Sequence, residues 1–186
     1  AIASLLARIG TADRVVPQPA LGDIVDGFDL SRFGRATAKF DPAELAQINA
    51  RVIQQLDFAA VETDLVAAGV GGGAPFWRAV RDNLGTVAEA ADWWSVCTAP
   101  VTPVIEAEAQ AVTNAAADLL PEGDLSADIW DDWTRAVAAQ TGVKGRGLFM
   151  PLRLALTGRQ KGPEIAPLLS FMGRARVIER LRGNTA

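Results

Sequence analysis

The sequence predicts an all-α fold, a helical bundle or cage of two or three small subdomains. Apolar residues recur at helical spacing along most of the chain, and capping residues with glycine or proline stops separate these stretches. No alternating strand pattern is long enough to trust. The 186 residues, 49% hydrophobic and 22% charged, are typical of a globular domain. No catalytic nucleotide-binding fold is predicted.

The composition also excludes several functional classes. No uninterrupted apolar run reaches the roughly 18 residues of a transmembrane helix, so no membrane contact is predicted. The N-terminal AIASLLARIG lacks the basic leader and cleavage site of a signal peptide. The absence of histidine excludes His-dependent nucleophiles and metal sites, and a single cysteine excludes thiolate zinc clusters. We therefore predict no catalytic residue and no metal site.

The single cysteine, Cys97, cannot form a disulfide within the chain. It is predicted to be a small buried thiol in a reducing, cytoplasmic compartment.

Residues 1–68 are predicted to form a helical region. Residues 2–9 have helical spacing from the very start, and because no initiator methionine precedes them we expect a piece of something longer. Asp41 is a predicted N-cap, with Pro42 in the first turn and Glu44 at the capping-box position. The apolar residues that follow on one helix face are Leu45, Ile48, Val52 and Ile53.

A second helical stretch, 58–68, ends at Gly69, where the segment GVGGGAP (69–75) begins. Four glycines and a proline do not sustain a helix, so this segment is predicted to be a mobile linker. A phosphate-binding GxGxxG loop is the alternative. It is disfavoured because no strand precedes the glycines and no acidic residue follows at the dinucleotide spacing.

Further helices are predicted in the remaining chain, each bounded by capping residues, glycine or proline: 76–84, 86–94, 104–120, 126–141, 147–156, 164–172 and a last helix through Leu181. Four tryptophans, Trp93, Trp94, Trp130 and Trp133, have helical spacing. This spacing favours packing in the core over stacking on nucleic-acid bases.

Charge is distributed unevenly. The net charge is −4, but residues 142–186 hold nine basic and two acidic side chains, a net charge of +7, and the remaining chain has a net charge of −11. A basic module on an acidic body is typical of proteins that bind an anionic partner. A solvated helical surface without a partner is the alternative.

The strongest local signal is KGRGLFMPLRLALTGRQKGPEI, residues 144–165. It joins an apolar helix to a glycine-containing loop in which Arg159 and Lys161 offer donors to phosphates or base edges. Pro163 begins the next helix, whose free N–H groups face the loop. Arg153 lies within the apolar helix, and the sequence leaves open whether it binds a partner or only packs and pairs within the fold.

These residues also resemble a known family. The run from Lys144 to Leu181, with LFMPLRLALTGR, GPEI, LLSFMG and ERL, resembles the C-terminal anticodon-binding end of bacterial glutamyl-tRNA synthetases. Upstream, WRAVRDNLGTVAEAADWW, FDPAELAQINARVI and AIASLLARIG resemble successive segments that follow the family's catalytic domain. The resemblance covers nearly the whole chain and is most specific over 147–165. The sequence departs from it at 47–49, where Gln-Ile-Asn replaces the usual Trp-Leu-Asn.

The resemblance implies a stem-contact region at 1–68, a linker at 69–75, and an anticodon-binding region in two parts, 76–142 and 143–186. The anticodon-binding positions that it implies, carried over one by one, are Arg81, Asn83, Arg153, Thr157, Arg159, Gly162, Pro163, Glu164 and Ile165. Some family members have an arginine at the position of Asn83. Lys161 and Arg174 are expected to neutralise phosphates.

The resemblance implies that a parent protein activates glutamate with ATP and Mg²⁺ and transfers it to tRNA. Both class I catalytic signatures are absent here, so this chain alone is expected to be inactive and to need no cofactor. The expected partner is tRNA(Glu), with acceptance of tRNA(Gln) left open, and the chain is expected to be monomeric. The alternative is a free-standing helical protein-interaction module that no longer binds tRNA; an unrecognised enzyme is a more distant one.

Overall fold

A computed structural model describes residues 1–35 and 37–186, and this part of the chain is helical, with no β-strand apart from an isolated bridge between Thr11 and Phe33. The all-α prediction is confirmed. The α-helices are α1 Ile2–Leu6, α2 Leu21–Asp26, α3 Pro42–Gln55, α4 Glu62–Ala67, α5 Gly73–Val80, α6 Glu89–Thr98, α7 Gln110–Asp118, α8 Ile129–Thr141, α9 Arg146–Thr157, α10 Ile165–Met172 and α11 Arg174–Leu181. Four short 3₁₀ helices are η1 Leu30–Arg32, η2 Phe58–Ala60, η3 Arg81–Asn83 and η4 Ala107–Ala109.

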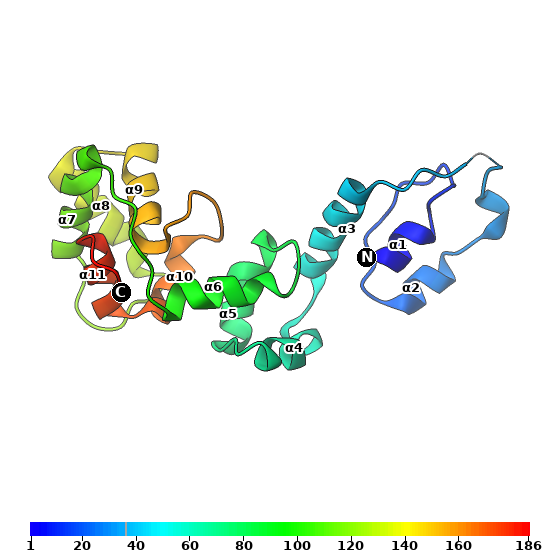
Figure 1. The fold of residues 1–186 in the computed structure, drawn as a ribbon, viewed down its shortest axis with the longest axis horizontal. Coiled ribbons are helices and arrows are strands. Elements are labelled where there is room, and N and C mark those ends of the chain that lie inside the picture. The colour runs from blue at the N-terminus through cyan, green and yellow to red at the C-terminus, as the bar shows by residue number, and fades with distance from the viewer. Residues whose placement is uncertain (36) are drawn as a thin grey trace.

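The molecule is elongated (Figure 1). Helices α1 and α2 lie at one end, α7 to α11 form a lobe at the other, and α3, α5 and α6 lie between them. One large core of buried side chains extends from Ile53 to Leu181, and a small cluster of Leu5, Ile48 and Val52 joins α1 to α3. Because α3 contributes to both, it connects the two ends of the molecule.

Helix α3 follows the sequence prediction closely. The Asp41 carboxylate accepts a hydrogen bond from the Ala43 N–H at 2.8 Å, and Pro42 is the first helical residue. The Asn49 amide donates to the Gly85 carbonyl at 2.6 Å and so fixes α3 against the turn before α6. That turn uses Glu89, which accepts from the Gly85 N–H at 2.9 Å and from the Thr86 hydroxyl at 3.1 Å.

Several helices begin later than the sequence predicts. Helix α7 begins at residue 110 rather than 104, because residues 99–106, which include Pro100 and Pro103, follow an irregular path before the 3₁₀ turn η4. Helix α8 begins at residue 129 rather than at the predicted cap, Ser126. The stretch 58–68 is split into η2 and α4.

The glycine-rich segment differs from the mobile linker that the sequence predicts. Residues 73–75 form the first turn of α5, and Val70 is buried in the large core. A Cβ atom on Gly71 would lie 2.6 Å from the Trp94 ring, and one on Gly72 would lie 2.9 Å from the Phe171 ring. Glycine is required here because the backbone packs directly on aromatic rings, and not because the segment has to be conformationally free.

The tryptophans pack in the core as predicted. Trp77, Trp93 and Trp133 are buried, and Trp94 and Trp130 are half-buried. The buried indoles of Trp77 and Trp133 donate to backbone carbonyls at 2.9 Å, which satisfies their N–H groups. Cys97 is fully buried, and burial raises the pKa of its thiol to about 12.

Among residues 1–35 and 37–186, no group of three or more acidic or cysteine side chains is arranged to hold a metal ion. None of the helices described is both long and apolar enough to cross a membrane.

Candidate nucleic-acid interface

Most of the predicted binding residues lie on helix α9 or on the loop that follows it, residues 158–164, which we call the 158–164 loop. Gly158 ends the helix in the left-handed conformation, with φ of 67°. The buried Thr157 hydroxyl donates to the Arg153 carbonyl at 2.7 Å and accepts from the Arg159 N–H at 3.1 Å. Thr157 therefore shapes the turn from inside the fold, and its side chain does not face solvent as a direct RNA contact requires.

Arg153 joins α9 to the far end of the 158–164 loop. One of its guanidinium nitrogens, Nη2, donates to the Pro163 carbonyl at 2.8 Å. The other, Nη1, is buried and has no hydrogen-bond partner among the described residues. Burial lowers the pKa of Arg153, and the charge of Glu164 opposes that shift. A buried donor without a partner is costly, so Nη1 would gain from an acceptor on a ligand that reaches it.

A pocket of about 370 Å³ opens beside Arg153. It lies between α8, α9 and the start of α10, and its lining residues are Trp130, Asp131, Phe149, Arg153, Glu164, Ile165 and Ala166. Trp130 and Phe149 stack with ring centroids 6.2 Å apart, and 45% of Phe149 is exposed. The pocket therefore combines an exposed aromatic ring with charged groups, the features that bind an unstacked base.

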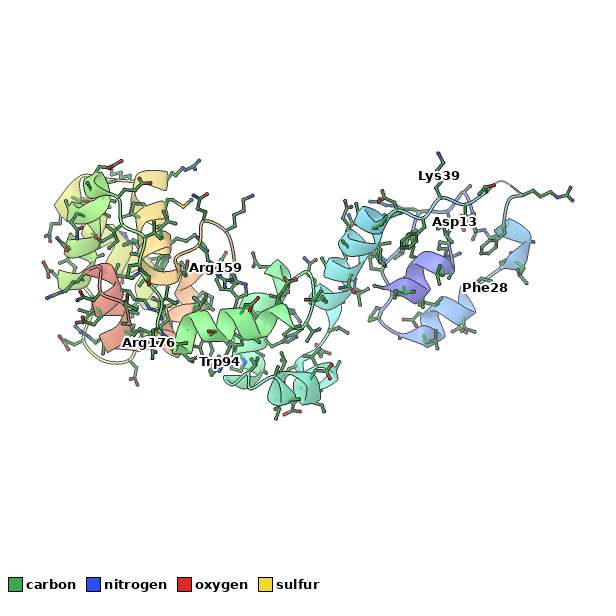
Figure 2. The ribbon with its side chains drawn as sticks, in the orientation of Figure 1. Asp13, Phe28, Lys39, Trp94, Arg159 and Arg176 are labelled. Carbon is green, nitrogen blue, oxygen red and sulfur yellow. The ribbon has the colours of Figure 1, made fainter. Side chains whose placement is uncertain are left out.

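The 158–164 loop presents positive charge to solvent. Arg159 and Lys161 are exposed, and neither forms an ion pair within the described part of the chain. The Arg159 guanidinium lies 4.7 Å from the centre of the Trp93 ring, a cation–π contact. Arg159 is labelled in Figure 2. Both cations are available to neutralise phosphates.

Backbone packing determines the path of the same loop. A Cβ atom on Gly162 would lie only 2.1 Å from the Trp93 ring. The loop backbone therefore approaches the Trp93 ring directly, which a residue with a Cβ atom would prevent. Pro163 and Ile165 are buried, Ile165 begins α10, and Glu164 between them is exposed.

The two upstream candidates lie on η3. Arg81 donates to the Leu56 carbonyl at 3.2 Å, and its Nε is 3.6 Å from the Asp82 carboxylate. Asn83 lines a second pocket, of about 490 Å³, together with Arg78 and Glu164. The fold thus brings Asn83 close to Glu164 from a distant part of the chain. Arg78 was missed by the sequence analysis, although it lies in the same family-like run as Arg81.

Arg174 lies away from these pockets and is used within the fold. Its guanidinium donates to the Leu120 and Pro121 carbonyls at 3.0 and 3.1 Å and to the Glu122 carboxylate at 2.9 Å. Arg176 similarly donates to the Met172, Cys97 and Thr98 carbonyls. The excess positive charge of the C-terminal residues is therefore only partly available to a partner, and the 158–164 loop is where the candidate residues present it.

Comparison with known proteins places this interface in a family. The model of the anticodon binding domain matches residues 76–184. The chain belongs to the anticodon-binding-domain family. It is 50% identical over its whole length to glutamate–tRNA ligase 2 of Methylorubrum populi and 45% identical over 92% of its length to glutamate–tRNA ligase 1 of Ruegeria pomeroyi. These matches cover 41% and 39% of the two ligases and lie in the C-terminal part, so the chain spans about two fifths of their length.

Solved structures give the same fold. The glutamate–tRNA synthetase of Elizabethkingia anophelis superposes on 97% of this anticodon-binding-family chain with a TM-score of 0.74 at 19% identity, and the match covers 39% of that protein. At this identity, the likeness shows that the helical arrangement is shared.

Proposed function

We propose that this chain recognises the anticodon of tRNA(Glu) and positions the tRNA as the C-terminal part of a glutamate–tRNA ligase. The parent would attach glutamate to tRNA with ATP in the cytoplasm, using catalytic residues outside this chain. We propose a stem-contact role for residues 1–68 and an anticodon-binding role for 76–142 and 143–186, with 69–75 as a packed connection. The family and the names of the relatives support the tRNA partner.

The observation that carries the proposal is the pocket beside Arg153. Anticodon bases are single-stranded and can leave the stack, so a pocket that offers a ring and hydrogen-bonding groups suits them. The exposed ring of Phe149 offers a stacking surface, and Nη1 of Arg153 lacks an acceptor that a base edge would provide. Arg159 and Lys161 lie on the loop next to this pocket, where they suit the anticodon backbone.

The arginine of the pocket and the lysine of the loop should have different effects. Arg153→Ala should weaken binding by roughly 1–3 kcal/mol, and more for tRNA(Glu) than for the same tRNA with a changed anticodon. Lys161→Ala should weaken binding to both RNAs equally and reduce the salt slope by about one unit. Titrations at several salt concentrations measure both effects.

Arg153 also donates to the Pro163 carbonyl, so thermal unfolding of each variant is the control. If Arg153→Ala lowers the melting temperature and leaves anticodon selectivity intact, Arg153 is structural only. If the unsubstituted chain does not bind tRNA(Glu) even at low salt, the alternative of a protein-interaction module is favoured. The same titration with tRNA(Gln) shows whether both tRNAs are accepted, and sedimentation tests the expected monomer.

Phe149 provides a second test of the pocket. Phe149→Ala should weaken tRNA(Glu) binding by roughly 1–3 kcal/mol, because a stacked base loses its aromatic surface. Phe40 is the matched control, since it is similarly exposed but lies in the N-terminal region. Phe40→Ala should leave anticodon discrimination unchanged. An unchanged affinity of Phe149→Ala for tRNA(Glu), or a loss of anticodon discrimination in Phe40→Ala, would contradict the assignment of the pocket.

A further inference from the structure

The Trp93 ring packs against the 158–164 loop, although the sequence analysis assigned Trp93 no role in binding. It lies on α6 with only 6% of its surface exposed. Two of its ring carbons would lie 2.1 and 2.2 Å from a Cβ atom on Gly162, and Arg159 stacks over the same ring at 4.7 Å. One indole therefore contacts the loop at two separate places.

The rest of the loop is held at its ends. At its start, the Thr157 hydroxyl accepts from the Arg159 N–H at 3.1 Å, and at its end the Pro163 carbonyl accepts from Arg153 at 2.8 Å. Between these anchors, Gln160 and Lys161 are exposed. The contact of Trp93 with Gly162 and the Arg159 side chain is thus what supports the middle of the loop from beneath.

We propose that Trp93 is a positioning residue, which holds the 158–164 loop against α6 and orients Arg159 and Lys161 toward the bound tRNA. The proposal rests on the proposed function for its RNA consequence, but its structural part stands alone. Only a residue without a side chain fits at Gly162, because φ is +146° and the ring occupies the place of a Cβ atom. The ring and the glycine are complementary, and loss of either should release the loop.

Limited trypsin digestion tests the structural part without RNA. Arg159 and Lys161 are trypsin sites inside the loop, and mass spectrometry identifies cleavage there. Trp93→Leu should increase the rate of cleavage after these two residues by about tenfold, whereas Trp93→Phe, which retains a ring, should restore most of the protection. Circular dichroism confirms that each variant is folded, and Gly162→Ala, whose Cβ atom meets the Trp93 ring, keeps the test decisive if Trp93→Leu does not fold.

Trp94 is the matched control. It is the adjacent tryptophan on α6, and it packs on Phe76, Phe171 and Gly71 rather than on the loop. Trp94→Leu should lower the melting temperature about as much as Trp93→Leu without exposing the two loop sites. Equal cleavage of the loop in both variants, or unchanged cleavage in Trp93→Leu, would overturn the proposal.

Binding measurements test the RNA part. Trp93→Leu should weaken tRNA(Glu) binding by about three- to tenfold, the range of one lost cation–π contact and a loosened loop, and Trp93→Phe should recover most of it. If the unsubstituted chain does not bind tRNA, the proposed function fails while the digestion still decides the role of Trp93. If the chain binds and the digestion shows a released loop, but Trp93→Leu binds as tightly as the unsubstituted chain, the positioning role is wrong.

A double variant provides an independent check. Gly162→Ala alone should expose the loop to trypsin, because its Cβ atom meets the Trp93 ring. In the Trp93→Leu background the same substitution should have a smaller additional effect, because the clash with the ring is gone and only the strain of the positive φ remains. Additive effects of the two substitutions would show that they act separately and would contradict the proposed complementarity.

Discussion

Arg180 is a fully buried charge with no aspartate or glutamate partner within the described part of the chain. Its guanidinium donates to the carbonyls of Val96 and Ala99 at 2.8 Å, to that of Leu156 at 2.7 Å and to that of Ala186 at 2.8 Å. The Val96, Ala99 and Leu156 carbonyls lie near the C-terminal ends of α6 and α9, where backbone acceptors lack helical partners. Burial lowers the pKa of Arg180 to about 10. The four hydrogen bonds offset the loss of hydration that burial of the charge causes.

Residue type alone predicts some of these roles and not others. Cys97 was correctly predicted to be buried and the tryptophans to pack in or against the core, because such side chains favour the core wherever the helical period places them. Arg174, predicted to neutralise phosphates, donates to carbonyls more than 50 positions away. Only the tertiary fold brings those acceptors together, so a basic residue bound in this way has the same sequence signal as one that binds RNA.

The buried thiol of Cys97 should make stability fall at alkaline pH. Its pKa is raised from 9.0 to about 12 in the folded chain, so above pH 9 the unfolded chain loses a proton that the folded chain keeps. The free energy of unfolding should decrease by about 1.4 kcal/mol per pH unit between pH 9 and 12 from this group. Urea unfolding of the chain and of Cys97→Ala, which cannot titrate there, measures the difference.

Accessibility of the same thiol provides a second readout. At pH 8, iodoacetamide should label Cys97 slowly in the folded chain and rapidly in urea. Parallel stability curves for the chain and Cys97→Ala across pH 9–12 would show that the thiol ionises freely in the folded state.

At the scale of helices, the sequence predicts existence better than boundaries. Caps with local partners, such as Asp41 and Gly158, mark helix ends correctly because the interaction spans a few residues. The start of α7 was missed because the segment before it is held by distant partners, with the Val101 and Val104 N–H groups donating to the Ala186 and Leu154 oxygens at 2.9 and 3.3 Å. The pocket beside Arg153 lies between α8, α9 and α10. Its aromatic lining residues, Trp130 and Phe149, were not predicted, because a helical period does not show which aromatic side chains stay partly exposed.

Substitutions in the segment before α5 test directly whether that segment is a packed connection or a mobile linker. Gly71→Ala should destabilise the chain by about 1–3 kcal/mol, because its Cβ atom would lie 2.6 Å from the Trp94 ring. Gly22→Ala is the matched control on α2, where no atom lies within 4 Å of the new methyl group. It should be neutral or stabilising by up to about 1 kcal/mol. Denaturant unfolding measures the free energy of unfolding of both variants. Equal and small changes would support the mobile linker that the sequence predicted.

At the scale of the whole molecule, burial is divided unequally between the two ends. The large core holds side chains from α3 through α11, whereas the N-terminal cluster has three buried apolar residues. Large apolar side chains of the first 40 residues remain exposed: Ile2, Leu6, Val16, Leu21, Val25, Phe28, Leu30 and Phe40. Hydrophobic stabilisation scales with the area removed from water, so the N-terminal end has much less of it.

This imbalance predicts the order in which the chain opens. Amide hydrogen exchange should be fast in α1 and α2 and slow in α6, α9 and α11, because local opening near α1 exposes little buried surface. Helix α3 should be intermediate, since Ile48 and Val52 face the small cluster while Ile53 belongs to the large core. Exchange measured by mass spectrometry on peptides of the native chain resolves these helices. Equal protection of α1 and α6 would contradict the division, because it would require the two ends to unfold as one cooperative unit.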